Sequence, residues 1–195
     1  MTRVRLFWRD AENMTTVGFI GSGQIGSAIP RLAIEAGHQV MLSNSRGPET
    51  LADTAADLGP RASAATSGEA AAAGDIVVVT VPVKAFPNLP AAPLAGKTVI
   101  DTCNYGPERD GHIPVLDSKS LTSSELLLRY IPDAMLVKAF NNIFYKHLLS
   151  LARPAGGGRP LLPADRRGLR AGEGGGDRVH RLHRVQRGGR GIAGR

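Results

Sequence analysis

The sequence predicts an α/β protein built on a doubly wound parallel sheet, followed by a disordered tail rich in Arg and Gly. Strand-like runs alternate with helical patterns from residue 15 to about residue 152, which favours parallel strands joined by right-handed crossovers. The run DIVVVTVP at 75–82 is continuous and β-branched, as expected for a strand buried on both faces. A G-x-G-x-x-G sequence follows the first strand directly, which points to the Rossmann type of sheet.

Periodicity and end signals indicate the individual helices and strands. The helix expected at 27–37 carries apolar residues at helical spacing and stops at Gly37, and the one at 48–59 begins with Pro48 and stops at Gly59. Two further helices are expected at 122–130 and 142–152, and a small Ala-rich one at 67–73. The expected strands are 15–20, 38–44, a weak 62–66, 75–82, 97–104 and 134–140.

The chain is expected to hold one domain, at 14–155, with a segment on either side. Met14 stands directly before the first strand, so we interpret residues 1–13 as a start-site overcall or a short disordered leader. Residues 156–195 contain ten Arg and twelve Gly but no Phe, Trp, Tyr or Lys. They are expected to be disordered, because so few apolar side chains cannot offset the entropy of ordering.

The net charge of +7 belongs to the tail alone. Of 24 Lys and Arg and 17 Asp and Glu, the tail holds ten Arg and three acids, which leaves 14 of each sign in the body. A basic tail could bind nucleic acid through its charge, but it lacks the aromatic residues that stack on bases. Nucleic acid is therefore not the expected partner of the body.

Cysteine content and hydropathy bear on the compartment. Cys103 is the single cysteine, so no internal disulfide forms, which fits a reducing cytoplasm. No apolar run approaches the ~20 residues of a membrane span, and residues 1–13 lack the apolar core of a secretory signal. A cytoplasmic protein with no membrane association is expected.

The glycine motif at 21–26 predicts a pyrophosphate site. Gly21 permits the tight turn after the strand, Gly23 lets the backbone approach a pyrophosphate, and Gly26 lets helix and strand pack closely. The free N–H groups of the helix start would face the anion. The alternative is a glycine-rich turn without a ligand.

The end of the second strand indicates NADP(H) as the cofactor. An NAD-preferring site usually has Asp or Glu there for the ribose 2′-hydroxyl, whereas this strand ends in Asn44, Ser45 and Arg46, with no acid before Glu49. Arg46 can clamp a 2′-phosphate, and Asn44 and Ser45 can donate hydrogen bonds to it. The alternative for Arg46 is a solvated surface charge.

The stretches GFIGSGQIGSAIPRLAIEAGHQVMLSNSRGP, DIVVVTVP and VKAFNN resemble those of a known family. Over residues 14 to about 155 the chain is similar to the NADPH-dependent coenzyme F-420 reductases, and its dinucleotide domain also resembles that of pyrroline-5-carboxylate reductases. The resemblance implies hydride transfer between NADP(H) and a deazaflavin, with coenzyme F-420 as the co-substrate. It also allows a homodimer, as in intact relatives.

The resemblance implies four groups of site residues, all beyond the carboxyl ends of strands. Ser22, Gly23, Gln24 and Ile25 would hold the diphosphate, and Ser45 and Arg46 the 2′-phosphate. Val81 and Pro82 would border the nucleotide cleft. The nicotinamide and its partner would be faced by Asn104, Ala139, Phe140 and Asn141.

Other polar residues are given no catalytic role. Cys103 is expected to be a buried small hydrophobe, and His112 and His147 do not form a metal set. Lys138 could approach a substrate or be solvated at its strand end. No general acid or base is assigned. The competing functions are an NADPH-dependent imine or carbonyl reductase without deazaflavin, a non-catalytic NADPH-sensing regulator, and a nucleic-acid binder through the tail.

The tail also admits an interpretation as a frame-shifted translation. Codons exist for GGRPLLPADRRG, from Gly157, that give AADRSYLPIAGD when read from the second base. Continuing through the tail allows AKAAATEFIDSIGYNAVDAGSL, which completes a strand, helix and strand and resembles the family's ending. On this interpretation the sheet lacks its last one or two strands and the helix packed on them, so reduced solubility and weak or absent activity are expected of this chain.

Overall fold

The computed structural model of the chain describes residues 14–143 and 145–151. Contacts divide the chain into Met1–Ala155 and Gly156–Arg195, and every described residue lies in the first unit. The expectations for the leader and for the tail lie outside the described residues.

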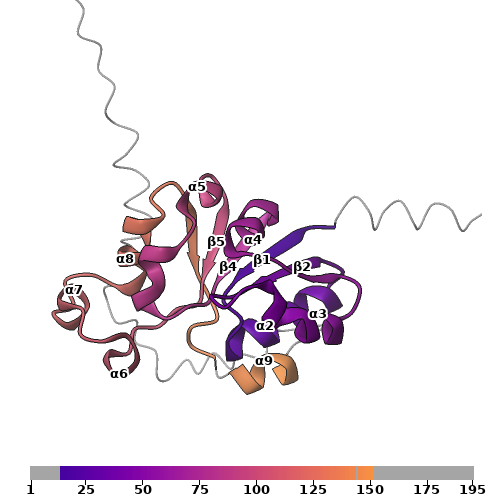
Figure 1. Cartoon of the computed structure of the whole chain (residues 1–195). Coiled ribbons are helices and arrows are strands. Elements are labelled where there is room, and N and C mark those ends of the chain that lie inside the picture. Colours follow the sequence, from indigo (N-terminus) through magenta and orange to yellow (C-terminus); the bar gives the residue numbers. More distant parts are fainter. Residues whose placement is uncertain (1–13, 144, 152–195) are drawn as a thin grey trace, which may run out of the picture. The chain divides into compact units, whose positions relative to one another are not determined.

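The described residues form a six-stranded parallel sheet in the order β3-β2-β1-β4-β5-β6 (Figure 1). The chain adds strands outward from β1 on one side, through β2 and β3, and then returns beside β1 to add β4, β5 and β6 on the other side. Doubly wound dinucleotide-binding sheets have this order, so the predicted fold class is confirmed. The strands are β1 (Thr16–Ile20), β2 (Gln39–Ser43), β3 (Ala62–Ala64), β4 (Ile76–Val79), β5 (Thr98–Asp101) and β6 (Met135–Lys138).

Helices connect the strands. The longer ones are α2 (Gln24–Glu35), α3 (Ala52–Leu58), α4 (Ser67–Ala73), α8 (Ser123–Tyr130) and α9 (Tyr145–Leu151), with the 3₁₀ turn η1 (Pro48–Leu51) leading into α3. The sequence did not predict four short elements: η2 (Val83–Asn88), α5 (Ala91–Leu94), α6 (Pro107–Asp110) and α7 (Pro114–Asp117). The fourth strand is shorter than predicted, because the chain turns into η2 at Pro82.

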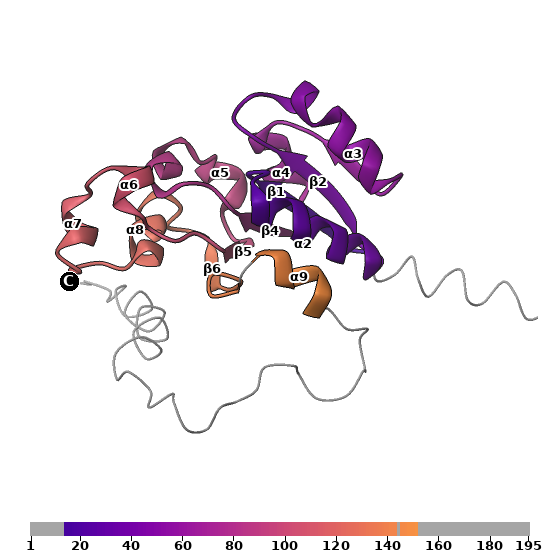
Figure 2. The ribbon, with the colours of Figure 1, turned by 90° about the horizontal axis from the view of Figure 1, so that it is seen from below.

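Each face of the sheet has its own core. On one face α2, η1 and α9 pack against the sheet around Phe19, Leu42 and Val78, and α9 lies along α2 (Figure 2). On the other face α4, η2, α5 and α8 cover Val77 and Val99. The sheet is therefore buried on both sides at its centre, which explains the continuous apolar run of β4.

Gly18 and Gly74 set the distance between β1 and α4. A Cβ on Gly18 would stand 2.1 Å from the carbonyl oxygen of Ala70, and one on Gly74 would stand 2.8 Å from the nitrogen of Gly18. Only glycine allows the helix to approach this closely. The approach places the start of α4 beside the carboxyl end of β2, where Ser67 Oγ lies 3.4 Å from Ser43 Oγ.

Strand β6 forms one edge of the described sheet and has an open face. Met135 and Val137 are 46% and 48% exposed. Met135 and Val137 are the register partners of Thr98 and Ile100 on β5. They lie on the face of the sheet that α2 covers nearer the centre. The described helices thus leave the outermost apolar side chains of this face in solvent.

Candidate dinucleotide-binding site

The loops after β1, β2 and β4 meet at the carboxyl edge of the sheet. The Gly21 N–H donates to the Ser43 carbonyl at 3.0 Å, and the Thr80 N–H donates to the Ile20 carbonyl at 2.9 Å. The Ser43 hydroxyl, fully buried, donates to the Phe19 carbonyl at 2.7 Å. These bonds hold the three loops at the switch point of the sheet, where open α/β proteins bind nucleotides.

Gly21 makes the turn out of β1 in a conformation that requires glycine. Its φ is +104°, and a Cβ there would lie 2.2 Å from the Thr80 carbonyl oxygen and 3.0 Å from a methyl group of Val81. The predicted tight turn is thus present, and it brings the glycine motif against the end of β4. Val81 and Pro82, predicted to border the cleft, are half-buried at this point.

Gly23, in contrast, has no packing reason to be glycine. A Cβ on it would meet nothing within 4 Å, and the residue is exposed. Gly23 caps α2 without a side-chain hydrogen bond, and the first turn of this helix, which contains Gln24, Ile25 and Gly26, holds no acid. Ser22 is half-buried beside it. Because the first N–H groups of any α-helix lack partners within the helix, the start of α2 beside this open space fits a pyrophosphate.

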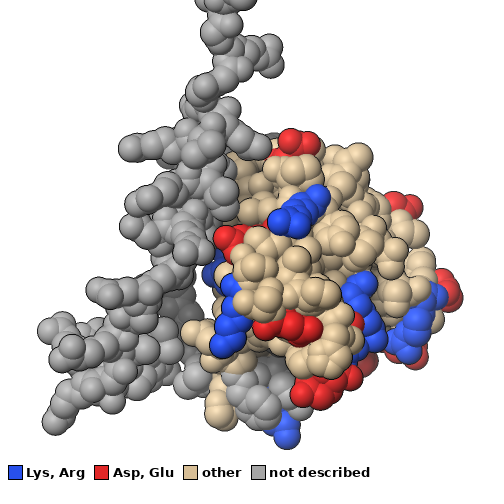
Figure 3. Space-filling view, turned by 90° about the vertical axis from the view of Figure 1, so that its left-hand side faces the viewer, with Lys and Arg blue, Asp and Glu red and all other residues tan. Residues whose placement is uncertain are grey.

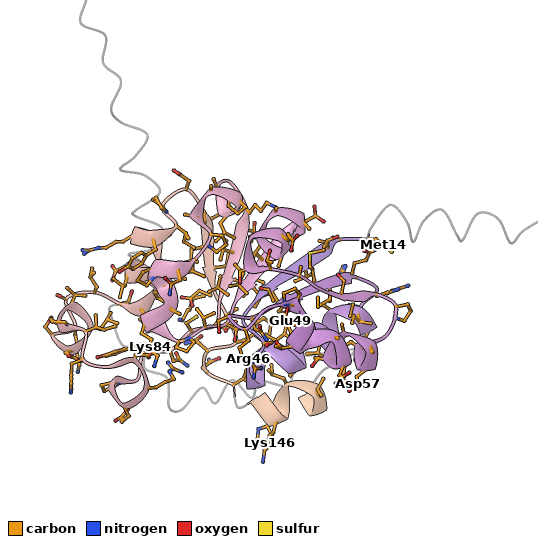
Figure 4. All side chains as sticks on the ribbon, in the orientation of Figure 1. Met14, Arg46, Glu49, Asp57, Lys84 and Lys146 are labelled. Carbon is orange, nitrogen blue, oxygen red and sulfur yellow. The ribbon has the colours of Figure 1, made fainter. Side chains whose placement is uncertain are left out.

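The loop after β2 is built by Asn44. Its side-chain oxygen accepts the N–H of Arg46 at 2.9 Å and of Gly47 at 3.1 Å, and its Nδ2 donates to Thr50 Oγ1 at 2.9 Å. Ser45 and Arg46 are exposed on this loop, and Arg46 lies at the carboxyl edge of the sheet (Figure 4). Ser45 and Arg46 are therefore presented to solvent, whereas the Asn44 amide bonds within its own loop.

Glu49 lies close to the same loop. A Cβ on Gly47, whose φ is +105°, would stand 2.3 Å from one carboxylate oxygen of Glu49. A carboxylate here would repel a phosphate bound near Arg46. The sequence shows that Glu49 follows this loop, but it does not reveal that the carboxylate of Glu49 folds back over Gly47.

The loops after β5 and β6 are joined by side chains. Asn104 Nδ2 donates to the Asn141 carbonyl at 2.7 Å, and the Asn104 carbonyl accepts a hydrogen bond from Arg109. Phe140 has a φ of +59°, which is uncommon for a residue other than glycine, and packs partly buried against the α2 core. The N–H of Ala139 donates to the Asp101 carbonyl at 3.1 Å. The four residues predicted to face the nicotinamide thus lie on two linked loops.

The polar residues that were given no catalytic role have structural surroundings that explain them. Lys138 pairs with the buried Asp101, with Nζ and Oδ2 3.0 Å apart, so it is neither free at a substrate nor simply solvated. Burial, assisted by the Asp101 carboxylate, raises the pKa of the Cys103 thiol to about 12, so the expected buried cysteine is confirmed. His112 lies 3.2 Å from Asp117.

Two further candidate features are not found in the described part of the chain. Across residues 14–143 and 145–151, no three His, Cys, Asp or Glu side chains come together as a metal site requires. None of the helices described there is both long and apolar enough to span a membrane. Positive and negative side chains are interspersed on the face in Figure 3, as expected from equal numbers of each in the body.

The strand order, the two-faced sheet and the glycine turn between β1 and α2 define a dinucleotide-binding domain of the Rossmann class. Residues 16–105 match the family model described as "NADP oxidoreductase coenzyme F420-dependent", so this part of the chain is similar to that family. The match and the fold together support NADP(H) binding and an oxidoreductase function.

Solved structures share the fold. A protein from Arthrobacter sp. FB24, provisionally described as an F420-dependent NADP-reductase, is 24% identical, with a TM-score of 0.61 over 74% of this chain and 70% of that one. Hypothetical protein SMa0349 from Sinorhizobium meliloti is 25% identical, with a TM-score of 0.61 over 77% of this chain and 71% of that one. No match was found among the curated proteins.

Proposed function

We propose that the chain transfers a hydride between NADPH and a deazaflavin acceptor of the coenzyme F-420 type. The observation that carries the nucleotide half is the open space at Gly23 beside the uncapped start of α2, with Arg46 exposed at the neighbouring loop. The choice of acceptor is supported by the family model that residues 16–105 match.

The residues would divide the work of binding between two ends of the nucleotide. The backbone of Ser22, Gly23 and the first turn of α2 would hold the diphosphate through its N–H groups. Ser45 and Arg46 would hold the 2′-phosphate, with the Asn44 side chain keeping their loop in shape. Val81 and Pro82 would border the cleft between these two ends.

The loops carrying Asn104 and Asn141 would hold the nicotinamide and the acceptor against each other. When bound, NADPH supplies the hydride, and the acceptor takes up that hydride with one proton from solvent. The protein's part is then to position two rings and to exclude water, which can contribute much of the rate. No side chain is assigned as general acid or base.

The test is hydride transfer by the purified full-length chain. Loss of NADPH absorbance would be followed with coenzyme F-420, with a cyclic imine, with a ketone, and with no acceptor. Turnover with F-420 supports the proposal. Turnover only with the imine or the ketone would replace it by the reductase alternative. Tight NADPH binding without any turnover, both in this chain and in a chain with the frame restored, would replace it by the sensing alternative.

A further inference from the structure

Asp101 is a buried carboxylate at the carboxyl end of β5 that holds three donors. Its side chain is fully buried, and Oδ2 accepts Lys138 Nζ at 3.0 Å and the Ser124 hydroxyl at 2.7 Å. Its other oxygen accepts the N–H of Cys103 at 2.8 Å. The carboxylate thereby ties together β5, β6 and the start of α8. An ionised group buried to this degree is retained only when it is paired and hydrogen-bonded.

Lys138 completes a clamp on the backbone of Cys103. Its Nζ donates both to Asp101 and to the Cys103 carbonyl, so Cys103 is held at its N–H by the carboxylate and at its C=O by the ammonium. Asp101 and Lys138 are register partners on adjacent parallel strands, so the pair spans neighbouring strand ends. The peptide plane held by Lys138 is the one that leads into Asn104.

Asn104 carries this constraint to the second loop. Its Nδ2 donates to the Asn141 carbonyl at 2.7 Å, two residues beyond the backbone bond from Ala139 to Asp101. We infer that the Asp101–Lys138 pair is a positioning device that fixes Asn104, and through it Asn141, on the acceptor side of the nucleotide site. This inference rests on the proposed function, because it takes the two loops to hold the acceptor against the nicotinamide. Lys138 acts through Asn104 and contacts neither cofactor nor acceptor.

A double-mutant cycle on the full-length chain tests this coupling. Lys138→Met should lower kcat/KM for the acceptor roughly tenfold or more, because small misplacements of positioning groups are costly. The Kd for NADPH should stay within about twofold. In an Asn104→Ala background, adding Lys138→Met should change kcat/KM by less than about twofold, since coupled sites are not additive. An undiminished effect of Lys138→Met in that background would overturn the inference.

Lys97→Met is the matched control for a purely structural lysine. Lys97 Nζ donates to the carbonyls of Ala71, Ala72 and Gly74 at 2.8, 2.5 and 2.7 Å, at the opposite end of β5 from Asp101. It should lower thermal stability without changing the acceptor kcat/KM of the folded protein. If Lys97→Met reduced acceptor turnover as much as Lys138→Met, the role of Lys138 would be structural only.

A second measurement needs no acceptor. In ¹⁵N NMR of the full chain, Lys138→Met should speed exchange of the Cys103 amide, which donates to Asp101, by roughly tenfold or more as the clamp opens locally. Lys97→Met should leave the exchange of this amide unchanged. Unchanged exchange in Lys138→Met would sink the inference even if hydride transfer were found. Faster exchange in a chain that reduced no acceptor would uphold the clamp and count against the proposed function alone.

Discussion

The side-chain oxygen of Asn44 accepts the backbone N–H of Arg46 at 2.9 Å. The same oxygen accepts the N–H of Gly47, and Thr50 closes the loop by bonding both to Asn44 and to the Gly47 carbonyl at 2.8 Å. Such a turn tolerates the positive φ of Gly47 and leaves the Arg46 side chain in solvent. Asn44 is therefore a residue that shapes the presentation of the guanidinium.

Removing the guanidinium should weaken NADPH binding selectively. For Arg46→Ala we expect the NADPH Kd to rise about tenfold or more, since a charge-assisted bond contributes about 1.5–3 kcal/mol. The NADH Kd should change little, because NADH has no 2′-phosphate. Fluorescence titration with both nucleotides measures this. Arg61→Ala is the matched control, because Arg61 is an exposed arginine just before β3, at the amino end of the strands. Equal losses of affinity for NADPH and NADH would show that Arg46 does not bind the 2′-phosphate.

Neutralising Glu49 should act in the opposite direction. Its carboxylate folds back over Gly47, close to where a 2′-phosphate would sit beside Arg46. For Glu49→Gln we expect NADPH to bind about two- to fivefold more tightly at low salt, because one repulsion between like charges is removed. The gain should shrink as the salt concentration rises. An equal gain in affinity for NADH would show that Glu49 does not act through repulsion of the 2′-phosphate.

Two glycines of one motif should separate folding from binding. Gly21→Ala should lower Tm by several degrees, because its φ of +104° costs an L residue about 1–2 kcal/mol and its Cβ would strike the Thr80 carbonyl. Gly23→Ala should leave Tm unchanged, since its Cβ meets no protein atom, but should weaken NADPH binding by blocking the backbone approach. Thermal unfolding and NADPH titration of both variants decide between these effects. Undiminished NADPH binding by Gly23→Ala would argue against a pyrophosphate at this turn.

The sheet was predictable because its signals are local and strong. The β-branched run of β4, the glycine stop after α2 and the alternation of elements each lie within one stretch of sequence. The short helices α6 and α7, with four residues each, carry no full helical period, so only Pro107 and Pro114 at their starts signal them.

Other features of the site depend on contacts far apart in the chain. Asp101 and Lys138 are separated by 37 positions, and no spacing in the sequence reveals that strand register makes them partners. The positive φ of Phe140 likewise has no sequence signature, because such a conformation is normally marked by glycine. The glycine motif could be placed from sequence because its strand and helix are contiguous with it.

The single thiol should be unreactive in the folded protein. With the pKa of Cys103 raised to about 12 by burial and by Asp101, about one thiol in 10⁴ is ionised at pH 8. In the unfolded chain roughly a quarter is ionised at that pH. Titration with Ellman's reagent should therefore find no reactive thiol in the native protein and one per chain in denaturant. A fast native reaction would mean that the β5 end opens readily.

Asp110 should make stability depend on acid pH. Burial disfavours its charge, but hydrogen bonds from Arg109 and from the Gly106 N–H outweigh this and hold the pKa of Asp110 below its ordinary 3.8. Because the folded-state pKa is the lower one, the stabilisation is fully present above about pH 5 and is lost as the pH falls through the folded value.

Urea unfolding should show a difference in the free energy of unfolding between wild type and Asp110→Asn at neutral pH that narrows below about pH 4. Asp57→Asn, which removes an exposed carboxylate on α3, is the matched control. A gap independent of pH would show that the charge of Asp110 does not contribute.

The open face of β6 gives a test of the interpretation that residues 156–195 are a frame-shifted tail. We expect one inserted or missing base near codon 157, and we expect a chain with the frame restored to cover Met135 and Val137, which are 46% and 48% exposed. Burying the exposed half of each side chain should raise the free energy of unfolding by about 1 kcal/mol per side chain. The decisive comparison is Val137→Ser in both backgrounds, measured by urea unfolding. It should change the free energy of unfolding little in the present chain, where this side chain is half in solvent, and should destabilise the restored chain by about 1–2 kcal/mol. Equal effects in the two backgrounds would mean that the restored segment does not pack on β6.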